Sequence, residues 1–404
     1  MLDEQPVSPA SNETPAAPRR NRARERHMRR QQRKQGMTTT RPTRVRRAVP
    51  LSDSGGFSLS DVDLRLLRAV VIGVGAVVFM ISVILAVGLF KNEPVEADPN
   101  ALWIGTEWTY QVHEDDAVRD FVRLLREHEI ATLYAQVSDL NFDSSWTGRP
   151  DLQNQFEEVR PEVAGFVAQI RRFYPEVTLY GVLGIRADLA ADSYRLDEER
   201  LQRVVADFST QVIASLGFDG VLLNVEPVWN GDTNYLALLR RVRQGIGQEA
   251  LLAIATPPDW TPVDADVPTP AVIAAGTVWD TEYKQRVALI RPDQIVIRSY
   301  NSYLTDANEY AEWVTYQVRA YVDAISPLQI DTQLMIGVPT YDNDLPAHDV
   351  AVENVLSALI GIRRAVSGLT EEEALLVRGL ALYAEWTTDT GEWSQFKSQW
   401  IDRS

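Results

Sequence analysis

The C-terminal three quarters of the chain alternates between two hydrophobic patterns. Short apolar runs rich in Val, Ile, Leu and Tyr predict strands, and longer segments with one apolar face predict the helices between them. The predicted strands span residues 102–108, 131–137, 178–184, 220–226, 251–257, 294–300, 334–340 and 378–386. The predicted helices span residues 117–129, 162–173, 198–216, 234–246, 281–290, 308–325 and 350–366.

This alternation is typical of an α/β fold in which helices cover a parallel sheet. Eight strand–helix units over about 300 residues match the size of a (β/α)₈ TIM barrel. We therefore predict one such barrel at residues 101–404. The alternative is a doubly wound open sheet, which more often has fewer strands and a glycine-rich phosphate turn. The turn sequence G-x-G-x-x-G is absent here.

The N-terminal quarter contains one longer apolar run, residues 69–90. These 22 residues carry no charge, and a helix of this length can cross about 30 Å of hydrocarbon. Arginines precede this predicted transmembrane helix and an acidic linker, residues 91–100, follows it. The positive-inside rule then places the N-terminus in the cytoplasm and the barrel outside the cell membrane. The alternative is a signal peptide cleaved near Ala97, but residues 1–68 would be an unusually long leader.

Charge separates the start of the chain from the rest. The net charge is −16, yet residues 1–68 carry 15 Lys and Arg against 7 Asp and Glu. We predict a disordered basic cytoplasmic tail that contacts anionic lipid. Nucleic-acid binding is the alternative for this tail, although its few aromatic residues argue against base stacking.

No cysteine is present, which excludes disulfides, a lipoprotein anchor and thiolate metal sites. The histidines do not have the spacing of metal ligands, so we predict no metal and no cofactor. An exported domain of this kind is typical of a bacterial envelope protein. Oligomeric state is not indicated by any pattern in the sequence.

The fourth predicted strand ends in a carboxylate. Alternation along the strand places Leu222, Asn224 and Glu226 on one face, with Glu226 at the C-terminal rim, where barrels of this kind carry their active sites. Nearby Trp229 would favour the protonated form of an acid. Glu226 is therefore a candidate proton donor. The alternative is that it only caps or salt-bridges a loop at the rim, while Asp232 or Thr233 caps the next helix.

The segment F-D-G-V-L-L-N-V-E-P resembles the strand-four motif D-G-x-D-x-D-x-E of family 18 glycoside hydrolases, the chitinases and endo-β-N-acetylglucosaminidases. Asp219, Gly220 and Glu226 match the motif, whereas Leu222 and Asn224 replace its two middle aspartates. The Asn-x-Glu pair also resembles family 85 endo-β-N-acetylglucosaminidases. There an asparagine positions the substrate acetamide and a glutamate is the acid.

Other strand ends extend the family 18 resemblance. I-R-S-Y-N-S is similar to the strand-six motif M-x-Y-D, and I-G-V-P-T-Y-D is similar to G-x-P-x-Y-G on strand seven. R-G-L-A-L-Y-A-E-W resembles the strand-eight segment whose tryptophan forms the floor of the sugar site. The resemblance implies that Tyr300 is catalytic and that substrate is bound by Asn301, Tyr341, Asp342, Tyr383 and Trp386.

The resemblance implies substrate-assisted retaining hydrolysis of an N-acetylated glycan such as peptidoglycan or chitin. Glu226 would be acid and then base, Asn224 would accept the acetamide N–H, and Tyr300 would contact the acetamido oxygen. Neutral Asn224 would stabilise the cationic intermediate less than an aspartate, so turnover is expected to be slow. One alternative is an inactive glycan-binding or scaffold protein. Another is a glycosidase that needs no acetamido group and uses Asp342 or Glu385 as a second carboxylate.

Overall fold

The computed structural model describes residues 100–149, 152–187, 194–260, 267, 269–274, 276–342 and 345–403. The predicted tail at 1–68, the predicted membrane helix at 69–90 and the linker up to residue 99 lie outside these ranges. Within them, no helix is both long enough and apolar enough to span a bilayer.

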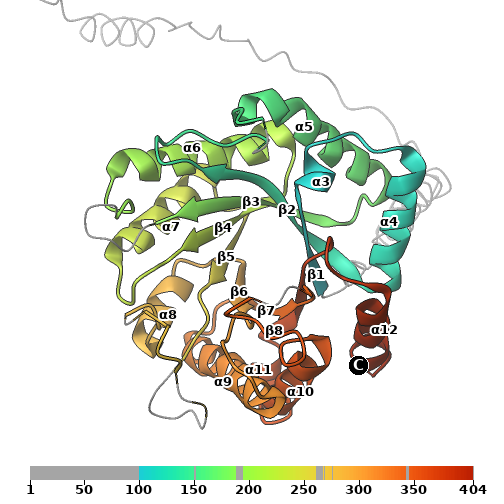
Figure 1. Cartoon of the computed structure of the whole chain (residues 1–404). Coiled ribbons are helices and arrows are strands. Elements are labelled where there is room, and N and C mark those ends of the chain that lie inside the picture. Colours follow the sequence, from blue (N-terminus) through green and yellow to red (C-terminus); the bar gives the residue numbers. More distant parts are fainter. Residues whose placement is uncertain are drawn as a thin grey trace, which may run out of the picture. The chain divides into compact units, whose positions relative to one another are not determined.

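Eight parallel strands close into a barrel in sequence order (Figure 1). The first strand pairs with the second and also with the last, Ala101 with Ala381, which excludes the open sheet. The predicted α/β barrel is therefore confirmed. The strands are β1 Asn100–Ile104, β2 Ile130–Leu140, β3 Thr178–Arg186, β4 Gly220–Glu226, β5 Leu251–Thr256, β6 Gln294–Arg298, β7 Gln333–Pro339 and β8 Val377–Tyr383.

Helices surround the strands in an outer ring (Figure 1). The helices that correspond to predicted ones are α4 Asp115–Glu127, α5 Phe156–Phe173, α6 Glu199–Leu216, α7 Thr233–Ile246, α8 Thr281–Ala288, α9 Ala307–Ile325 and α10 Val355–Val366. Short elements that the sequence pattern did not predict are α3 Thr106–Thr109, α11 Glu371–Ala374, α12 Thr390–Gln399, η1 Ser326–Leu328 and η2 Ile401–Arg403.

Several predicted boundaries were wrong, and two of them show why. The first predicted strand ran to residue 108, but pairing with β2 ends at Ile104, and α3 follows because Trp108 stacks on Phe121 of α4 with ring centroids 4.1 Å apart. The last predicted helix began at residue 350, but α10 begins after Asn354, whose side chain accepts a hydrogen bond from Ser357 N. The residues before it form a loop over the barrel mouth.

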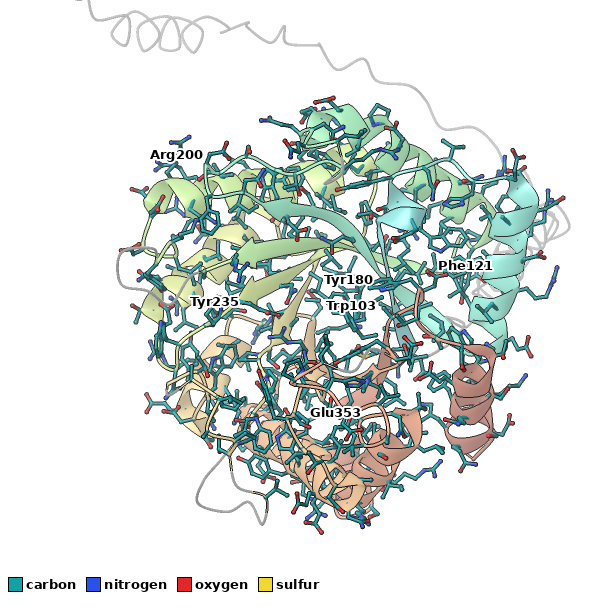
Figure 2. The ribbon with its side chains drawn as sticks, in the orientation of Figure 1. Trp103, Phe121, Tyr180, Arg200, Tyr235 and Glu353 are labelled. Atoms are coloured by element: carbon teal, nitrogen blue, oxygen red, sulfur yellow. The ribbon has the colours of Figure 1, made fainter. Side chains whose placement is uncertain are left out.

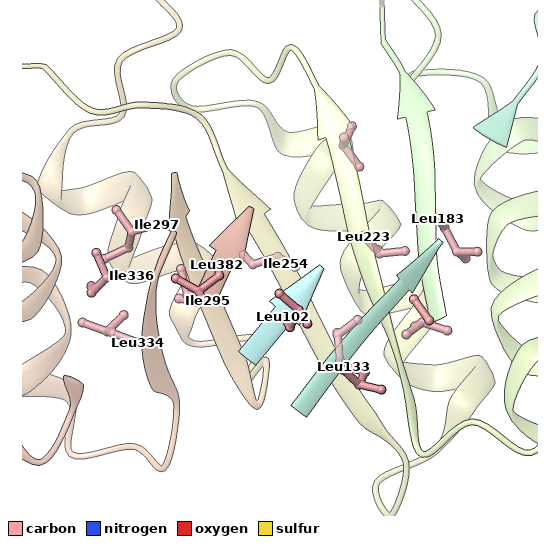
Figure 3. Packing of buried hydrophobic residues seen from close by; sticks show 14 of the residues in the cluster. Leu102, Leu133, Leu183, Leu223, Ile254, Ile295, Ile297, Leu334, Ile336 and Leu382 are labelled. Carbon is pink, nitrogen blue, oxygen red and sulfur yellow. The ribbon is translucent and has the colours of Figure 1, made fainter. Parts of the chain in front are cut away.

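The hydrophobic core has two layers. Between strands and helices, every strand contributes outward-facing Leu, Ile or Val side chains (Figure 3). Inside the barrel a smaller cluster contains Trp103, Tyr134 and Tyr180, and Trp103 and Tyr180 lie near its centre (Figure 2). Small alanines on β5 and β8 leave room for these rings. The barrel interior is thus packed with side chains, as is usual for this fold.

Candidate active site

A cavity of about 660 Å³ lies at the C-terminal ends of the strands. It has the size of a small-ligand site, and its lining combines aromatic and polar side chains. Seven of the residues predicted from the sequence line it: Asn224, Glu226, Tyr300, Asn301, Tyr341, Tyr383 and Trp386. The other lining residues are Trp103, Ile104, Gly105, Thr106, Glu107, Gln136, Asp139, Arg298, Leu345 and Thr387.

Strand β4 delivers the two central polar side chains. Its alternation is as predicted, because Leu222 is buried in the barrel interior while Asn224 and Glu226 reach the cavity above it. Within the described residues, Asn224 Oδ1 is enclosed and has no hydrogen-bond partner. A buried acceptor without a partner costs free energy unless a ligand donates to it. The amide oxygen is therefore placed to receive a donor from a bound molecule.

Glu226 pairs with a cation that the sequence analysis did not select. Arg298, the last residue of β6, forms an ion pair with Glu226 Oε1 and donates from Nε to Thr256 O at 2.7 Å. Its side chain points inward because Val296, two residues earlier, lies in the barrel interior. Burial lowers the pKa of Arg298, but a guanidinium stays charged in proteins.

This pairing changes the expected surroundings of the acid. Trp229 does not line the cavity and packs instead over Gly276, so the predicted apolar neighbour of Glu226 was wrong. The alternative that Glu226 forms a salt bridge at the rim is borne out in part, but the pair lies inside the cavity. Asp232 caps α7 by accepting from Asn234 N at 2.8 Å, as predicted.

A group of tyrosines forms one wall of the cavity. The ring of Tyr383 stacks on Tyr300 with centroids 5.2 Å apart, and meets Tyr341 and Trp386 edge-on. Desolvation by burial raises the pKa of each of the three tyrosines. They are therefore neutral hydroxyl groups at physiological pH, able to donate hydrogen bonds. Trp386 is 48% exposed and presents its ring at the cavity mouth.

The loops after β6 and β7 are joined by one buried carboxylate. Glu353 accepts hydrogen bonds from Asn301 N at 2.8 Å and from Ser302 N at 2.7 Å, and His348 Nδ1 lies 3.0 Å from its Oε2. Tyr341 in turn packs on His348 and donates to Asn301 Oδ1 at 2.6 Å. Glu353 thus fixes the position of two cavity residues without lining the cavity itself. No motif in the sequence marked it.

A second carboxyl faces the cavity from β2. The prediction ended this strand at residue 137, but it continues to Leu140 with an irregularity between Gln136 and Ser138. One extra residue, Val137, shifts the alternation, so Gln136 and Asp139 both line the cavity although they are three positions apart. Desolvation raises the pKa of Asp139. A strand pattern with period two could not have identified this residue.

Several candidates are not brought to the site. Asp342 and Glu385 do not line the cavity, and Asp342 is exposed on the loop after β7. Four other tryptophans pack in the core or against it: Trp108, Trp146, Trp260 and Trp393. Trp103 and Trp386 are the tryptophans that line the cavity.

Comparison with known proteins gives a likeness of fold. No protein-family model and no curated protein sequence matches the chain. Among solved structures, a class V chitinase from Pseudomonas fluorescens is 11% identical, with a TM-score of 0.47 over 74% of this chain and 98% of that one. The spore cortex-lytic enzyme SleL from Bacillus cereus is 13% identical, with a TM-score of 0.47 over 74% of both chains.

A third solved structure, a family 18 chitinase from Flavobacterium johnsoniae, is 11% identical, with a TM-score of 0.45 over 75% of this chain and 94% of that one. A family 18 chitinase is thus among the solved structures that the chain is similar to. At these identities the likeness concerns the fold.

Proposed function

We propose that the barrel is a glycoside hydrolase that cleaves an N-acetylated glycan of the peptidoglycan or chitin type. The observation that carries this proposal is the placement of Glu226 and Asn224 side by side on β4, both facing one cavity. The free acceptor on Asn224 matches the N–H of an acetamido group. The tyrosine wall and Trp386 supply the aromatic surface and hydroxyl donors that sugars bind.

In the proposed reaction the acetamido oxygen attacks the anomeric carbon, and the bond to the leaving oxygen breaks. Glu226 gives its proton to that oxygen, and the positive charge moves onto the cyclic oxazolinium ion. Ionised Glu226 then takes a proton from water as the water oxygen bonds to the anomeric carbon. The bond from that carbon to the acetamido oxygen breaks, which opens the ring and regenerates the substrate's acetamide. Arg298 stabilises this ionised form by its ion pair. Asn224 holds the acetamide N–H, and Tyr300 donates to the acetamido oxygen.

The proposal includes the location of the enzyme. Residues 69–90 are proposed to anchor the chain in the cell membrane, with the basic N-terminal tail in the cytoplasm and the barrel outside. The substrate would then be an envelope polysaccharide within reach of a tethered enzyme.

An inactive glycan-binding protein is the second candidate, favoured by Leu222 and neutral Asn224 in place of two aspartates. The third candidate, a glycosidase with Asp342 or Glu385 as second carboxylate, has less support because neither residue lines the cavity.

Release of reducing ends tests the proposal. The full chain in detergent micelles is incubated with N-acetylglucosamine oligomers and, separately, with peptidoglycan, beside the same chain carrying Glu226→Gln. We expect product from the unaltered chain and almost none from the variant. Binding of the oligomers without product in either form would overturn the enzyme proposal and support the glycan-binding protein.

Trp386→Ala tests the sugar-stacking role of the exposed ring. Because an aromatic stack contributes about 0.5 to 1.5 kcal/mol beyond its area, we expect KM for an oligomer to rise about two- to tenfold with kcat nearly unchanged. Steady-state kinetics measure both constants. Phe142→Ala is the matched control, since Phe142 is 67% exposed and does not line the cavity. An equal rise in KM for both variants would contradict a specific role for Trp386.

A further inference from the structure

The shape of strand β2 presents a carboxyl that the reaction scheme above does not use. After the irregularity at Val137, Thr147 forms hydrogen bonds with both the backbone N–H and the backbone carbonyl of Asp139. Asp139 N donates to Thr147 Oγ1 at 3.1 Å, and Thr147 N donates to Asp139 O at 2.9 Å. The side chain is therefore aimed into the cavity by a fixed piece of backbone.

The residue of β3 that pairs with Asp139 is a glycine, which has no side chain. Asp139 pairs with Gly184 of β3, and a Cβ added at Gly184 would collide with Asp139 Oδ1. The carboxyl thus occupies the space over β3. On the far side Gly184 pairs with Asn224 of β4, and adjacent strands are about 4.8 Å apart. The carboxyl of Asp139 therefore reaches over Gly184, on the strand that separates β2 from Asn224, and both side chains line the same cavity.

Asp139 has no cation partner within the described ranges. The hydrogen bond described for its carboxyl comes from Gln136 Nε2, at 3.1 Å, and no Lys or Arg of the described residues forms an ion pair with it. Glu226, by contrast, is paired with Arg298. Glu107, the other carboxylate of the cavity, lies on α3 after β1, whereas Asp139 lies on β2 and pairs with Gly184, the residue of β3 that also pairs with Asn224. Asp139 is thus the cavity carboxyl best placed to act on a positively charged ligand group.

We propose that Asp139 supplies, from β2, the negative charge that the Asn224 position of β4 lacks, and that it stabilises the oxazolinium ion formed in the cavity. This inference rests on the proposed function. Asp139 transfers no proton in this step: the proton of the leaving group comes from Glu226, and the acetamide N–H stays bonded to Asn224 Oδ1. The carboxylate acts by its charge beside the ring on which the positive charge develops. Asp139 is then a catalytic residue, and the slow turnover expected from neutral Asn224 is offset.

Two variants alter this charge in different ways. Asp139→Asn removes it while keeping the shape and the hydrogen bond with Gln136. Gly184→Ala keeps the carboxyl but displaces it from β3 through the added methyl group. Gly165→Ala is the matched control, because a Cβ at Gly165 meets no atom within 4 Å.

Each variant, in the full chain, is assayed on two N-acetylglucosamine oligosides, one with a dinitrophenyl leaving group and one with an unactivated sugar. We expect Asp139→Asn to lower kcat about a hundredfold on both substrates, because the cation forms whatever the leaving group. Gly184→Ala is expected to lower kcat about tenfold, and Gly165→Ala less than twofold. The melting temperature of Asp139→Asn at pH 7 is expected to stay close to that of the unaltered chain, because the residue is exposed and keeps its shape in the variant.

Three outcomes would overturn the inference. Full activity of Asp139→Asn would show that its charge is not used. A loss confined to the unactivated substrate would make Asp139 the proton donor instead. If the unaltered chain does not hydrolyse either substrate, the proposed function fails and this inference fails with it. The first two outcomes differ from this one because in them the unaltered chain is active.

Discussion

Glu226→Gln is expected to reduce kcat/KM for an unactivated N-acetylglucosamine oligomer by about a thousandfold or more. Glutamine has nearly the same shape but cannot give a proton to the leaving oxygen, and positioned acids contribute about 10²–10⁴ to the rate. A dinitrophenyl leaving group needs no proton, so the loss on that substrate is expected to be about tenfold. The ratio of the two losses, measured by steady-state kinetics, isolates proton donation from general damage to the site.

The control for Glu226→Gln is a stability measurement, because the substitution also affects Arg298, the ion-pair partner of Glu226. Glutamine leaves the guanidinium of Arg298 without a carboxylate, so the thermal unfolding of Glu226→Gln is measured beside its kinetics. If the fold is intact and both substrates are hydrolysed as fast as by the unaltered chain, Glu226 is not the acid. Equal losses on both substrates would mean that the variant damages binding or positioning rather than proton transfer.

Glu353→Ala is expected to lower the free energy of unfolding by about 3–5 kcal/mol. The side chain is 1% exposed, and its removal leaves the N–H groups of Asn301 and Ser302 without their acceptor. His348 loses its hydrogen-bond partner at the same time. Because these groups hold the loops after β6 and β7, we also expect weaker glycan binding. Urea unfolding of the full chain in detergent measures the change.

The control for this prediction is Glu309→Ala, since Glu309 is exposed on α9. An exposed substitution of this kind changes stability by less than about 0.5 kcal/mol. A loss below about 1 kcal/mol in Glu353→Ala would contradict the role assigned to the buried carboxylate.

Most of the barrel could be predicted from hydrophobic periodicity. The bounds of β4 were correct to the residue, because a turn at Gly217 and a proline after Glu226 mark both of its ends. The sequence pattern failed to predict the bounds of elements that side-chain packing or strand pairing determines. The stack of Trp108 on Phe121 makes α3 a helix, and strand pairing carries β2 three residues further than its apolar run.

The candidate site could be predicted only in part. Residues at strand ends were found because the strand-four resemblance and the period of two both point to them. Arg298 was missed although alternation places it on the same face as Tyr300, because the strand-six resemblance assigns roles only to Tyr300 and Asn301. Asp139 was missed because an inserted residue reverses the alternation. Glu353 acts through a loop contact about fifty positions away in the sequence, which no local pattern records.

The central claim is that the substrate's own acetamido group is the nucleophile, with Glu226 as the acid beside it. The most direct test is inhibition of the unaltered chain by N-acetylglucosamine thiazoline, a stable analogue of the cyclic oxazolinium ion. We predict competitive inhibition of oligomer hydrolysis, with binding weakened in Asp139→Asn. Hydrolysis that proceeds at the same rate with saturating thiazoline would contradict the account.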